Sequence, residues 1–470
     1  MYFEHIYERG LAQASYFVGC QASGTAIVID PRRDVDIYLE IAEREGLSIR
    51  YVTETHIHAD FLSGARELAA KTGAELLLSD EGGADWQYAF DHTPLHDGDS
   101  IMVGNVRLDV MHTPGHTPEH ISFLLRDLPA GEEPRMLFTG DFLFVGDVGR
   151  PDLLEEAAGV ADTREPGART LWNSLQRIKD LPDHVQVWPG HGAGSACGKA
   201  LGAVPNSSLG YERATGWAFN VADEDAFVTE ILDGQPEPPY YFAQMKRLNR
   251  DRAPETIVTE LPVVPELDPS EIRERVRIGD VQMIDLRDAE SYFAGHLQGS
   301  VNVPFDRGMS TWFGWLLDFD RPIVLVAERA QVGPAQRALL RIGLDRLEGF
   351  LEAGRVSTVG DLSRIGSIDV FEARRRREAG SLVLDVRGIT EYRDGHIDGA
   401  VHVHAGRLRN HLADLPRDRE ILVHCASGYR SAIATSVLDA AGFTKIANIR
   451  GGYDAWIAEN RESIVVAAVR

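Results

Sequence analysis

The chain has 470 residues, 44% hydrophobic and 26% charged, which is typical of globular protein and long enough for about three domains. Asp and Glu outnumber Lys and Arg by 72 to 48, and without a local basic patch this net charge of -24 argues against nucleic acid or membrane partners. We find no signal peptide, no apolar run of the roughly 18 residues that span a membrane, and only three scattered cysteines, so we expect a cytoplasmic protein with free thiols.

The first 250 residues alternate short apolar runs with helical patterns. Strands are predicted at 25–30, 48–55, 74–79, 101–104, 106–113, 120–126, 135–140 and 185–191, and helices at 61–73 and 167–181. This alternation predicts an α/β sandwich, and several of its loops carry His or Asp where a strand ends.

A proline-rich stretch at residues 251–265 is predicted to be a linker, and beyond it the sequence repeats itself. The pattern that runs from Asp285 through Gly-His to residue 301 recurs one hundred residues later, from Asp385 to residue 401. A repeat of this length indicates two copies of one small domain. Each copy alternates strands and helices, so we expect two parallel α/β domains, at 266–357 and 358–470.

Residue types that bind metals follow four predicted strands of the first half. They are His56, His58 and Asp60 in one loop, then His116, Asp141 and His191. One His-x-His pair alone is weak evidence, but four such strand-end elements in this order strongly indicate a metal centre.

These motifs resemble those of the metallo-β-lactamase superfamily over roughly the first 250 residues, which implies an αββα sandwich. The superfamily motif is His-x-His-x-Asp-His, and this chain departs from it because Phe61 stands at the last position. In dinuclear relatives that histidine and the preceding aspartate hold the second metal. The resemblance therefore implies a single metal and argues against two-zinc hydrolysis.

The one-metal branch that the chain resembles is the persulfide dioxygenases, whose iron is held by two histidines and one carboxylate. The resemblance assigns these ligands to His56, His116 and Asp141, with one Fe(II) per chain preferred to zinc, although zinc could be present in the protein as purified. A facial triad leaves open positions on Fe(II) for O2 and a substrate sulfur.

The same resemblance leaves His58, Asp60 and His191 to hydrogen-bond the ligands or to contact the substrate. Cys197 follows His191 closely, which suggests contact with the thiol end of the substrate or handling of a persulfide; an inert buried cysteine is the alternative. Cys20 lies in an apolar strand context and is expected only to pack.

A second candidate site lies near the C-terminus, where the predicted strand 420–425 ends at Cys425 and Arg430 follows. A cysteine at a strand-to-helix turn faces backbone N–H groups and a helix N-terminus, which stabilise a thiolate or an anionic persulfide. Arg430 suits oxyanions such as sulfite or thiosulfate. The loop resembles that of rhodaneses, whereas cysteine phosphatases need a longer loop to surround a phosphate.

The earlier copy lacks this chemistry. Glu328 aligns with Cys425 and Gly333 aligns with Arg430, and a carboxylate cannot carry a sulfane sulfur. We therefore expect residues 266–357 to be an inactive rhodanese-like spacer that orients the two active domains.

Together these resemblances imply a fused persulfide dioxygenase–sulfurtransferase of sulfide detoxification. It would oxidise a low-molecular-weight thiol persulfide with O2 to sulfite and thiol, and Cys425 would pass a sulfane sulfur to sulfite, giving thiosulfate. The reverse transfer from thiosulfate and the identity of the thiol (glutathione, coenzyme A, bacillithiol or another) stay open. Members of this branch often form dimers, so the resemblance also implies a homo-oligomer.

Two alternatives remain. The first is a zinc-dependent thioester hydrolase of the glyoxalase II kind with an appended sulfurtransferase domain. The second is a persulfide sensor or sulfur carrier without enzymatic activity.

Overall fold

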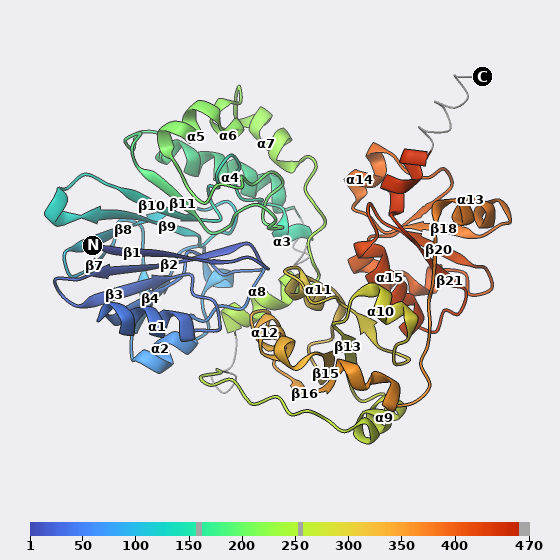
Figure 1. Ribbon diagram of the computed structural model, residues 1–470. Coiled ribbons are helices and arrows are strands. Elements are labelled where there is room, and N and C mark those ends of the chain that lie inside the picture. The colour runs from blue at the N-terminus through green and yellow to red at the C-terminus, as the bar shows by residue number, and fades with distance from the viewer. Residues whose placement is uncertain (157–161, 252–256, 460–470) are drawn as a thin grey trace. The chain divides into compact units, whose positions relative to one another are not determined.

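The computed structural model describes residues 1–156, 162–251 and 257–459, and its elements gather into two compact units (Figure 1). The first unit comprises Met1–Leu261 together with Leu340–Gly343, and the second comprises Pro262–Leu339 and the described residues from Leu344 onward. Within the described residues, no helix has the length and apolar character needed to cross a membrane.

Two six-stranded sheets form the first unit. The first sheet has the strand order β1(Tyr2–Glu8), β2(Gln13–Cys20), β3(Thr25–Ile29), β4(Ser48–Thr53), β5(Glu75–Ser79) and β6(Thr93–Leu95). The second has the order β12(Ser207–Ser208), β11(Gln186–Pro189), β10(Met136–Gly140), β9(Ile121–Asp127), β8(Val106–His112) and β7(Ser100–Val103). The pairs from β3 to β6 and the pair β10–β11 are parallel, and the others are antiparallel.

The two sheets pack face to face because each presents an alternating apolar face. In β8 the residues Val106, Leu108 and Val110 alternate inward, as the two-residue period of a strand requires, and they meet Val18 and Ile27 of the first sheet. Burying each such side chain contributes about 1.5–3 kcal/mol. The core of the first unit therefore lies between the sheets.

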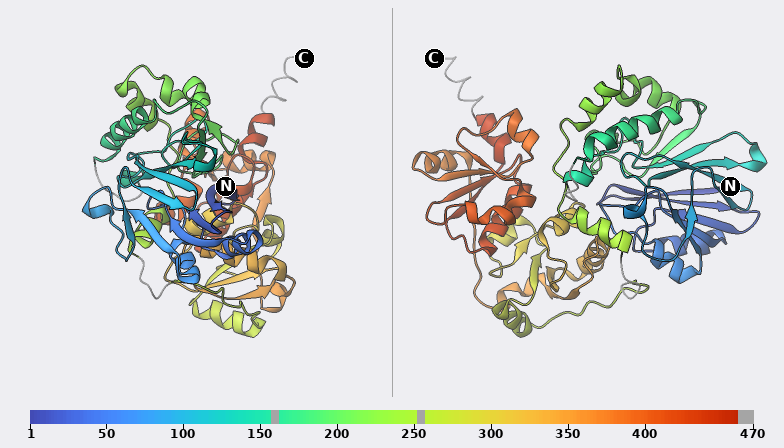
Figure 2. Two further views of the ribbon diagram at one scale, coloured as in Figure 1. Left: turned by 90° about the vertical axis from the view of Figure 1, so that its left-hand side faces the viewer. Right: turned by 180° about the vertical axis from the view of Figure 1, so that it is seen from behind.

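Helices cover the outer face of each sheet (Figures 1 and 2). The helices of this unit are α1(Asp36–Glu45), α2(Ala65–Thr72), α3(Leu153–Glu156), α4(Arg164–Arg177), α5(Leu209–Thr215), α6(Trp217–Asn220), α7(Glu224–Leu232) and α8(Tyr241–Asp251), with short 3-10 turns at Ala84–Trp86 and Leu128–Ala130. Helices α1 and α2 pack on the first sheet, and α4 and α7 pack on the second. This arrangement confirms the expected αββα sandwich.

The second unit contains two parallel sheets, one from each copy of the repeat. The first has the order β14(Val301–Asn302), β13(Gln282–Asp285), β15(Ile323–Ala327) and β16(Leu347–Glu352), and the second β17(Gly366–Ile368), β21(Ile446–Ile449), β20(Ile421–His424), β18(Leu382–Asp385) and β19(Val401–His402). Every pair is parallel. The expected parallel α/β domains are thus confirmed.

Helices and 3-10 turns connect these strands. They are α9(Pro269–Ile278), α10(Ala289–Ala294), α11(Met309–Leu316), α12(Arg329–Leu340), the 3-10 segment Ala353–Thr358, α13(Val370–Glu378), α14(Ile389–Asp394), the 3-10 segment Ala405–Asp414 and α15(Tyr429–Ala440). Residues 252–256 of the predicted linker 251–265 lie outside the described residues, and the domain boundaries at 250, 265 and 357 stay predictions.

Candidate functional site

Three of the predicted metal-binding side chains come together at one end of the sandwich of the first unit. His56, His116 and Asp141 each offer one donor atom, and the three atoms lie within 4.8 Å of one another. Asp141 Oδ2 is 3.6 Å from His116 Nε2 and 3.9 Å from His56 Nε2. All three residues are buried, and each follows the end of a strand or lies in the turn between two strands.

Hydrogen bonds on the far side of each imidazole orient the ring. His116 Nδ1 donates to the carbonyl oxygen of Arg150 at 3.0 Å, so its Nε2 keeps a lone pair that faces Asp141. His56 Nδ1 lies 3.0 Å from Thr55 Oγ1, which itself donates to Asp30. Burial, reinforced by neighbouring histidines, lowers the pKa of His56 well below its ordinary value, and burial also lowers the pKa of His116. Both rings are therefore in the neutral form that binds a metal.

The donor set fits a metal ion. His56 Nε2 and both carboxylate oxygens of Asp141 are buried and have no hydrogen-bond partner among the described residues. Buried polar atoms without partners are costly, and a cation shared by these donors would satisfy them together. Two imidazoles and one carboxylate suit a first-row transition metal.

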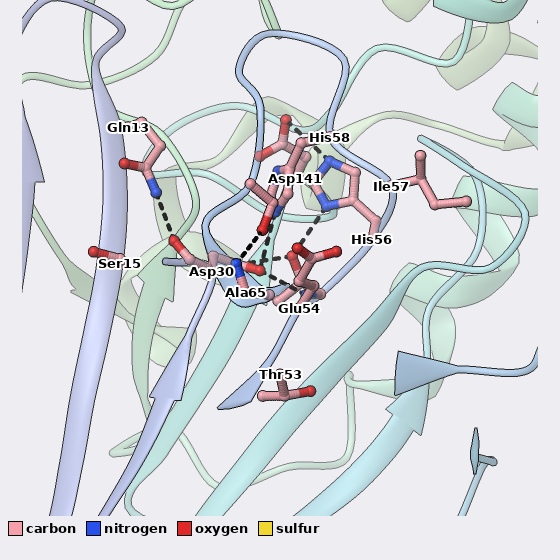
Figure 3. Close-up of polar contacts among 12 residues, drawn as sticks. Gln13, Ser15, Asp30, Thr53, Glu54, His56, Ile57, His58, Ala65 and Asp141 are labelled. Carbon is pink, nitrogen blue, oxygen red and sulfur yellow. Dashed lines mark hydrogen bonds and ion pairs between the residues drawn. The ribbon is translucent and has the colours of Figure 1, made fainter. Parts of the chain in front are cut away.

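His58 turns to a different partner. Its Nε2 lies 3.1 Å from Asp30 Oδ1, at the end of β3, as Figure 3 shows. Burial disfavours a charged ring, but the Asp30 carboxylate outweighs burial and raises the pKa of His58 to about 9. The structure thus places His58 beside the triad, with its Nε2 engaged by Asp30.

A second group of donors adjoins the triad. Atoms of Asp60, His191 and Cys197 lie within 4.8 Å of one another, and all three residues are buried. His191 Nε2 is 3.3 Å from Asp60 Oδ2 and 3.5 Å from Asp141 Oδ1. Burial opposes charge on His191, but Asp141 and Asp60 raise its pKa well above the ordinary value. Burial raises the pKa of the Cys197 thiol to about 12.

Phe61 fills the motif position at which the superfamily has a histidine. Its side chain is fully buried, and its ring centroid lies 4.4 Å from that of His58. An apolar ring here offers no donor atom to the adjoining group. Phe61 therefore could not bind a second metal ion, as the expectation of a single metal requires.

Sequence reasoning missed two residues that hold this loop and its ligands. Asn249 of α8 donates from Nδ2 to the carbonyl oxygens of His58 and Phe61 and accepts from Ser63 N–H. His120 Nε2 accepts from Asp141 N–H at 3.1 Å. The second histidine of His-Thr-Pro-Glu-His could have pointed to His120, whereas nothing near Asn249 in the sequence marks its role.

The glycine before Asp141 permits this close packing. Gly140 has a φ of +48°, and a Cβ there would lie 2.6 Å from His120 Nε2 and 2.5 Å from Thr55 Oγ1. Any larger residue would be strained and would displace both side chains. The Thr-Gly-Asp sequence thus reflects the packing that positions the carboxylate.

The second candidate site lies in the second unit. Cys425 follows β20 and precedes α15, its side chain is buried, and Gly428 N–H points at its Sγ with an N–S distance of 3.1 Å. Arg430 pairs through both terminal nitrogens with Glu391, at 2.5 and 2.7 Å. Sequence reasoning missed Glu391, which offsets part of the positive charge that Arg430 brings to this loop.

The two copies of the repeat share their framework although their loops differ. Arg287 Nη2 lies 2.6 Å from Asp285 Oδ2, and Arg387 makes the same contact with Asp385 at 2.6 Å. Glu328 follows β15 as Cys425 follows β20, which places a carboxylate where the other copy has its thiol. The first copy therefore lacks a sulfur nucleophile at this position.

Comparison with protein families identifies the domains that carry the two sites. The family described as "Metallo-beta-lactamase superfamily" matches residues 9–191, and the family described as "Rhodanese-like domain" matches residues 268–357 and 369–459. The chain belongs to the metallo-beta-lactamase superfamily and carries two rhodanese-like domains after its metallo-beta-lactamase domain.

Particular relatives refine this placement. A solved metallo-beta-lactamase from Staphylococcus aureus subsp. aureus COL is 42% identical with a TM-score of 0.67, and the match covers 74% of this chain and 98% of that one. The hydroxyacylglutathione hydrolase of Rhodospirillum rubrum is 34% identical over 37% of this chain and 60% of its own length. The mitochondrial persulfide dioxygenase of Bos taurus is 32% identical over 38% of this chain and 63% of its own length. The chain thus spans less than two thirds of either curated relative.

Proposed function

We propose that the chain is a non-heme iron persulfide dioxygenase joined to a rhodanese-type sulfurtransferase that acts in sulfide detoxification. The observation that carries this proposal is the buried group His56, His116 and Asp141, with Phe61 in place of a further ligand. Two histidines and one carboxylate match the set that non-heme Fe(II) oxygenases use. The likeness to a persulfide dioxygenase supports the substrate class.

Bound at this triad, Fe(II) supplies redox chemistry and open coordination positions for O2 and sulfur. The chain itself holds both imidazoles neutral and fixes their orientation through Arg150 and Thr55. In the overall reaction one persulfide, one O2 and one water give one thiol, one sulfite and two protons. His191, whose Nε2 faces the Asp141 carboxylate, is placed to hold a proton beside the reacting sulfur.

Cys425 performs the second step. Its thiolate takes the outer sulfur of a second persulfide and releases the carrier thiolate, and Gly428 N–H stabilises the sulfur anion. Sulfite then attacks that outer sulfur, Cys425 leaves as a thiolate, and thiosulfate forms. Because both sites belong to one chain, sulfite made at the first site has a raised effective concentration at the second.

A zinc-dependent thioester hydrolase is the second candidate. The likeness to a hydroxyacylglutathione hydrolase favours it, as does the second group of donors, Asp60 and His191. Phe61 counts against it, because it offers no donor to a second metal.

The decisive experiment is anaerobic purification of the full chain, metal analysis, and measurement of O2 uptake and products on adding glutathione persulfide. We expect iron near one per chain, rapid O2 uptake, and thiosulfate as product. The variant Cys425→Ser should keep the O2 uptake and release sulfite instead, because only the second step needs the thiol. Zinc without O2 uptake, together with hydrolysis of a glutathione thioester, would overturn the proposal.

A further inference from the structure

A cleft of about 450 Å³ opens in the first unit beside the metal-binding group. It lies between strand β1 with the turn that follows it, the loop that carries His191, and the segment 203–205. Its volume is that of a site for a small organic molecule. His191 lines the cleft, and its Nε2 lies 3.5 Å from Oδ1 of Asp141 in the metal-binding triad.

The structure ties this cleft closely to the metal-binding group. His191 is one of the residues that line the cleft, and its Nε2 faces Asp60 and Asp141, at 3.3 and 3.5 Å. Tyr7 of β1 packs against the loop that carries His191: a Cβ on Gly192 would lie 2.7 Å from the Tyr7 hydroxyl oxygen. A molecule in the cleft would therefore lie next to the metal ligands.

The charge of the cleft is opposite to that of the whole chain. The net charge of the chain is -24, yet no Asp or Glu is among the residues that line the cleft, and Arg9 is. Arg9 is exposed and forms no ion pair within the part of the chain that the structure describes. The adjacent Glu8 pairs with another cation, because its Oε1 lies 2.9 Å from Nη1 of Arg341.

The rest of the lining is largely apolar or neutral. Val204 is 58% exposed, and Pro205 follows it in the cleft wall. Burial lowers the pKa of His5, which keeps that ring neutral. The cleft thus combines one unpaired guanidinium, an apolar wall and a histidine whose Nε2 lies 3.5 Å from the Asp141 carboxylate.

We infer that this cleft holds the carrier part of the persulfide, with Arg9 pairing to a carboxylate or phosphate of the carrier and the sulfur end directed toward His191. This inference rests on the proposed function and names the substrate class of that site: a persulfide whose carrier bears an oxyanion. A guanidinium is the side chain best suited to such a group because it donates two parallel hydrogen bonds. Val204 and Pro205 contact the uncharged part of the carrier.

The test compares Arg9→Gln with the wild-type full chain, loaded with iron, on three persulfides. The carrier of glutathione persulfide bears carboxylates, that of coenzyme A persulfide bears phosphates, and that of 2-hydroxyethyl persulfide bears no charge. Loss of the charge-assisted pair between Arg9 and the oxyanion at an exposed site should raise KM roughly tenfold for the anionic carrier that the cleft accepts. We expect kcat to be unchanged, and KM for 2-hydroxyethyl persulfide, whose carrier is uncharged, to be unchanged as well. The anionic persulfide whose KM rises identifies carboxylate or phosphate as the recognised group.

The matched control is Arg50→Gln, which removes an exposed arginine of β4 that does not line the cleft. It should leave all three KM values unchanged. An Arg9→Gln enzyme with unchanged KM for both anionic persulfides, or with an equal rise for the uncharged one, would overturn the inference while leaving the dioxygenase intact. Absence of O2 uptake by the wild type with all three persulfides would instead overturn the proposed function, and this inference with it.

Discussion

At the scale of single residues, the partner of one ring nitrogen decides what each histidine can do. His116 gives its Nδ1 proton to a backbone carbonyl, so its Nε2 lone pair is free to bind a metal. His58 instead bonds to Asp30, and with a pKa of about 9 its ring is protonated at neutral pH when no metal competes. The His-x-His pattern in the sequence identified the loop, but the two roles follow from partners on other strands, which the sequence pattern does not contain.

A substitution of Phe61 tests whether this residue limits the site to a single metal. Asp60 has both oxygens, and His191 its Nε2, buried without a hydrogen-bond partner among the described residues. Phe61→His would add an imidazole next to this group, and we expect metal analysis to find a rise from about one to about two metals per chain when zinc is supplied. O2 uptake with persulfide should fall, because a second cation would compete for Asp141.

The control for this variant is Phe61→Leu, which keeps an apolar side chain and adds no donor. It should keep one metal per chain, with at most a modest loss of stability from the smaller side chain. A metal content that stays at one in Phe61→His would show that the aromatic ring is not what limits the site to a single metal.

At the scale of elements, the loop between β4 and α2 is held by α8, a helix that is distant from it in sequence but contacts it in the fold. Hydrophobic periodicity predicted a helix at 61–73, but α2 begins at Ala65. Residues 61–64 stay outside the helix, and Asn249 of α8 binds the backbone of His58, Phe61 and Ser63 there. Hydrophobic periodicity reflects which side chains of a segment are buried, so it predicted the strands and the helix. Such periodicity carries no information about a side-chain contact between Asn249 and a loop almost two hundred residues earlier.

Asn249 therefore sets the geometry of the metal loop without touching the ligand atoms. Asn249→Asp keeps the acceptor for Ser63 N–H and loses both donors, which leaves two buried carbonyl oxygens without this partner. We expect metal affinity to fall by about tenfold to a hundredfold, as is typical when groups that orient ligands are lost. Competition with a chelator measures the affinity, and Asn410→Asp, an exposed site in the second unit, is the control. An unchanged affinity together with unchanged stability would contradict this positioning role.

At the scale of the whole molecule, the second unit shows what a repeat can and cannot predict. The repeated residues predicted two domains of one fold, and their frameworks agree in detail: His296 stacks on Tyr292, and His396 on Tyr392, each with a centroid distance of 3.9 Å. The burial of the two histidines differs because the domains contact each other. His296 is fully buried and its Nε2 lies 3.0 Å from Asp439 of the other copy, whereas His396 is exposed.

This contact gives the first copy a structural part in the second copy, which carries Cys425. Asp439 lies in α15, the helix that begins just after the Cys425 loop, and Ser436 of the same helix accepts from Asn302 N–H at 3.0 Å. The first copy thus packs directly on the helix whose N-terminus supports the thiol. Its expected role as a spacer between the two active domains stays a prediction.

The two equivalent histidines allow a matched test of this interface in the full chain. In both, Nδ1 bonds the carbonyl oxygen of a tyrosine at 2.9 Å, so the variants His296→Gln and His396→Gln remove the same local contacts. Only the first also breaks a partly buried contact with a carboxylate, that of Asp439. We expect urea unfolding, followed by circular dichroism, to show a loss of about 2–4 kcal/mol for His296→Gln and under about 1 kcal/mol for His396→Gln.

A double-mutant cycle separates the interface from simple loss of packing. If the His296–Asp439 contact accounts for the difference, adding Asp439→Asn to His296→Gln should cost much less than Asp439→Asn alone, since the partner is already gone. Equal losses for the two histidine variants, or additive costs in the cycle, would mean that the burial of His296 does not stabilise the interface. Because α15 also supports the Cys425 loop, His296→Gln should slow thiosulfate formation while His396→Gln should not.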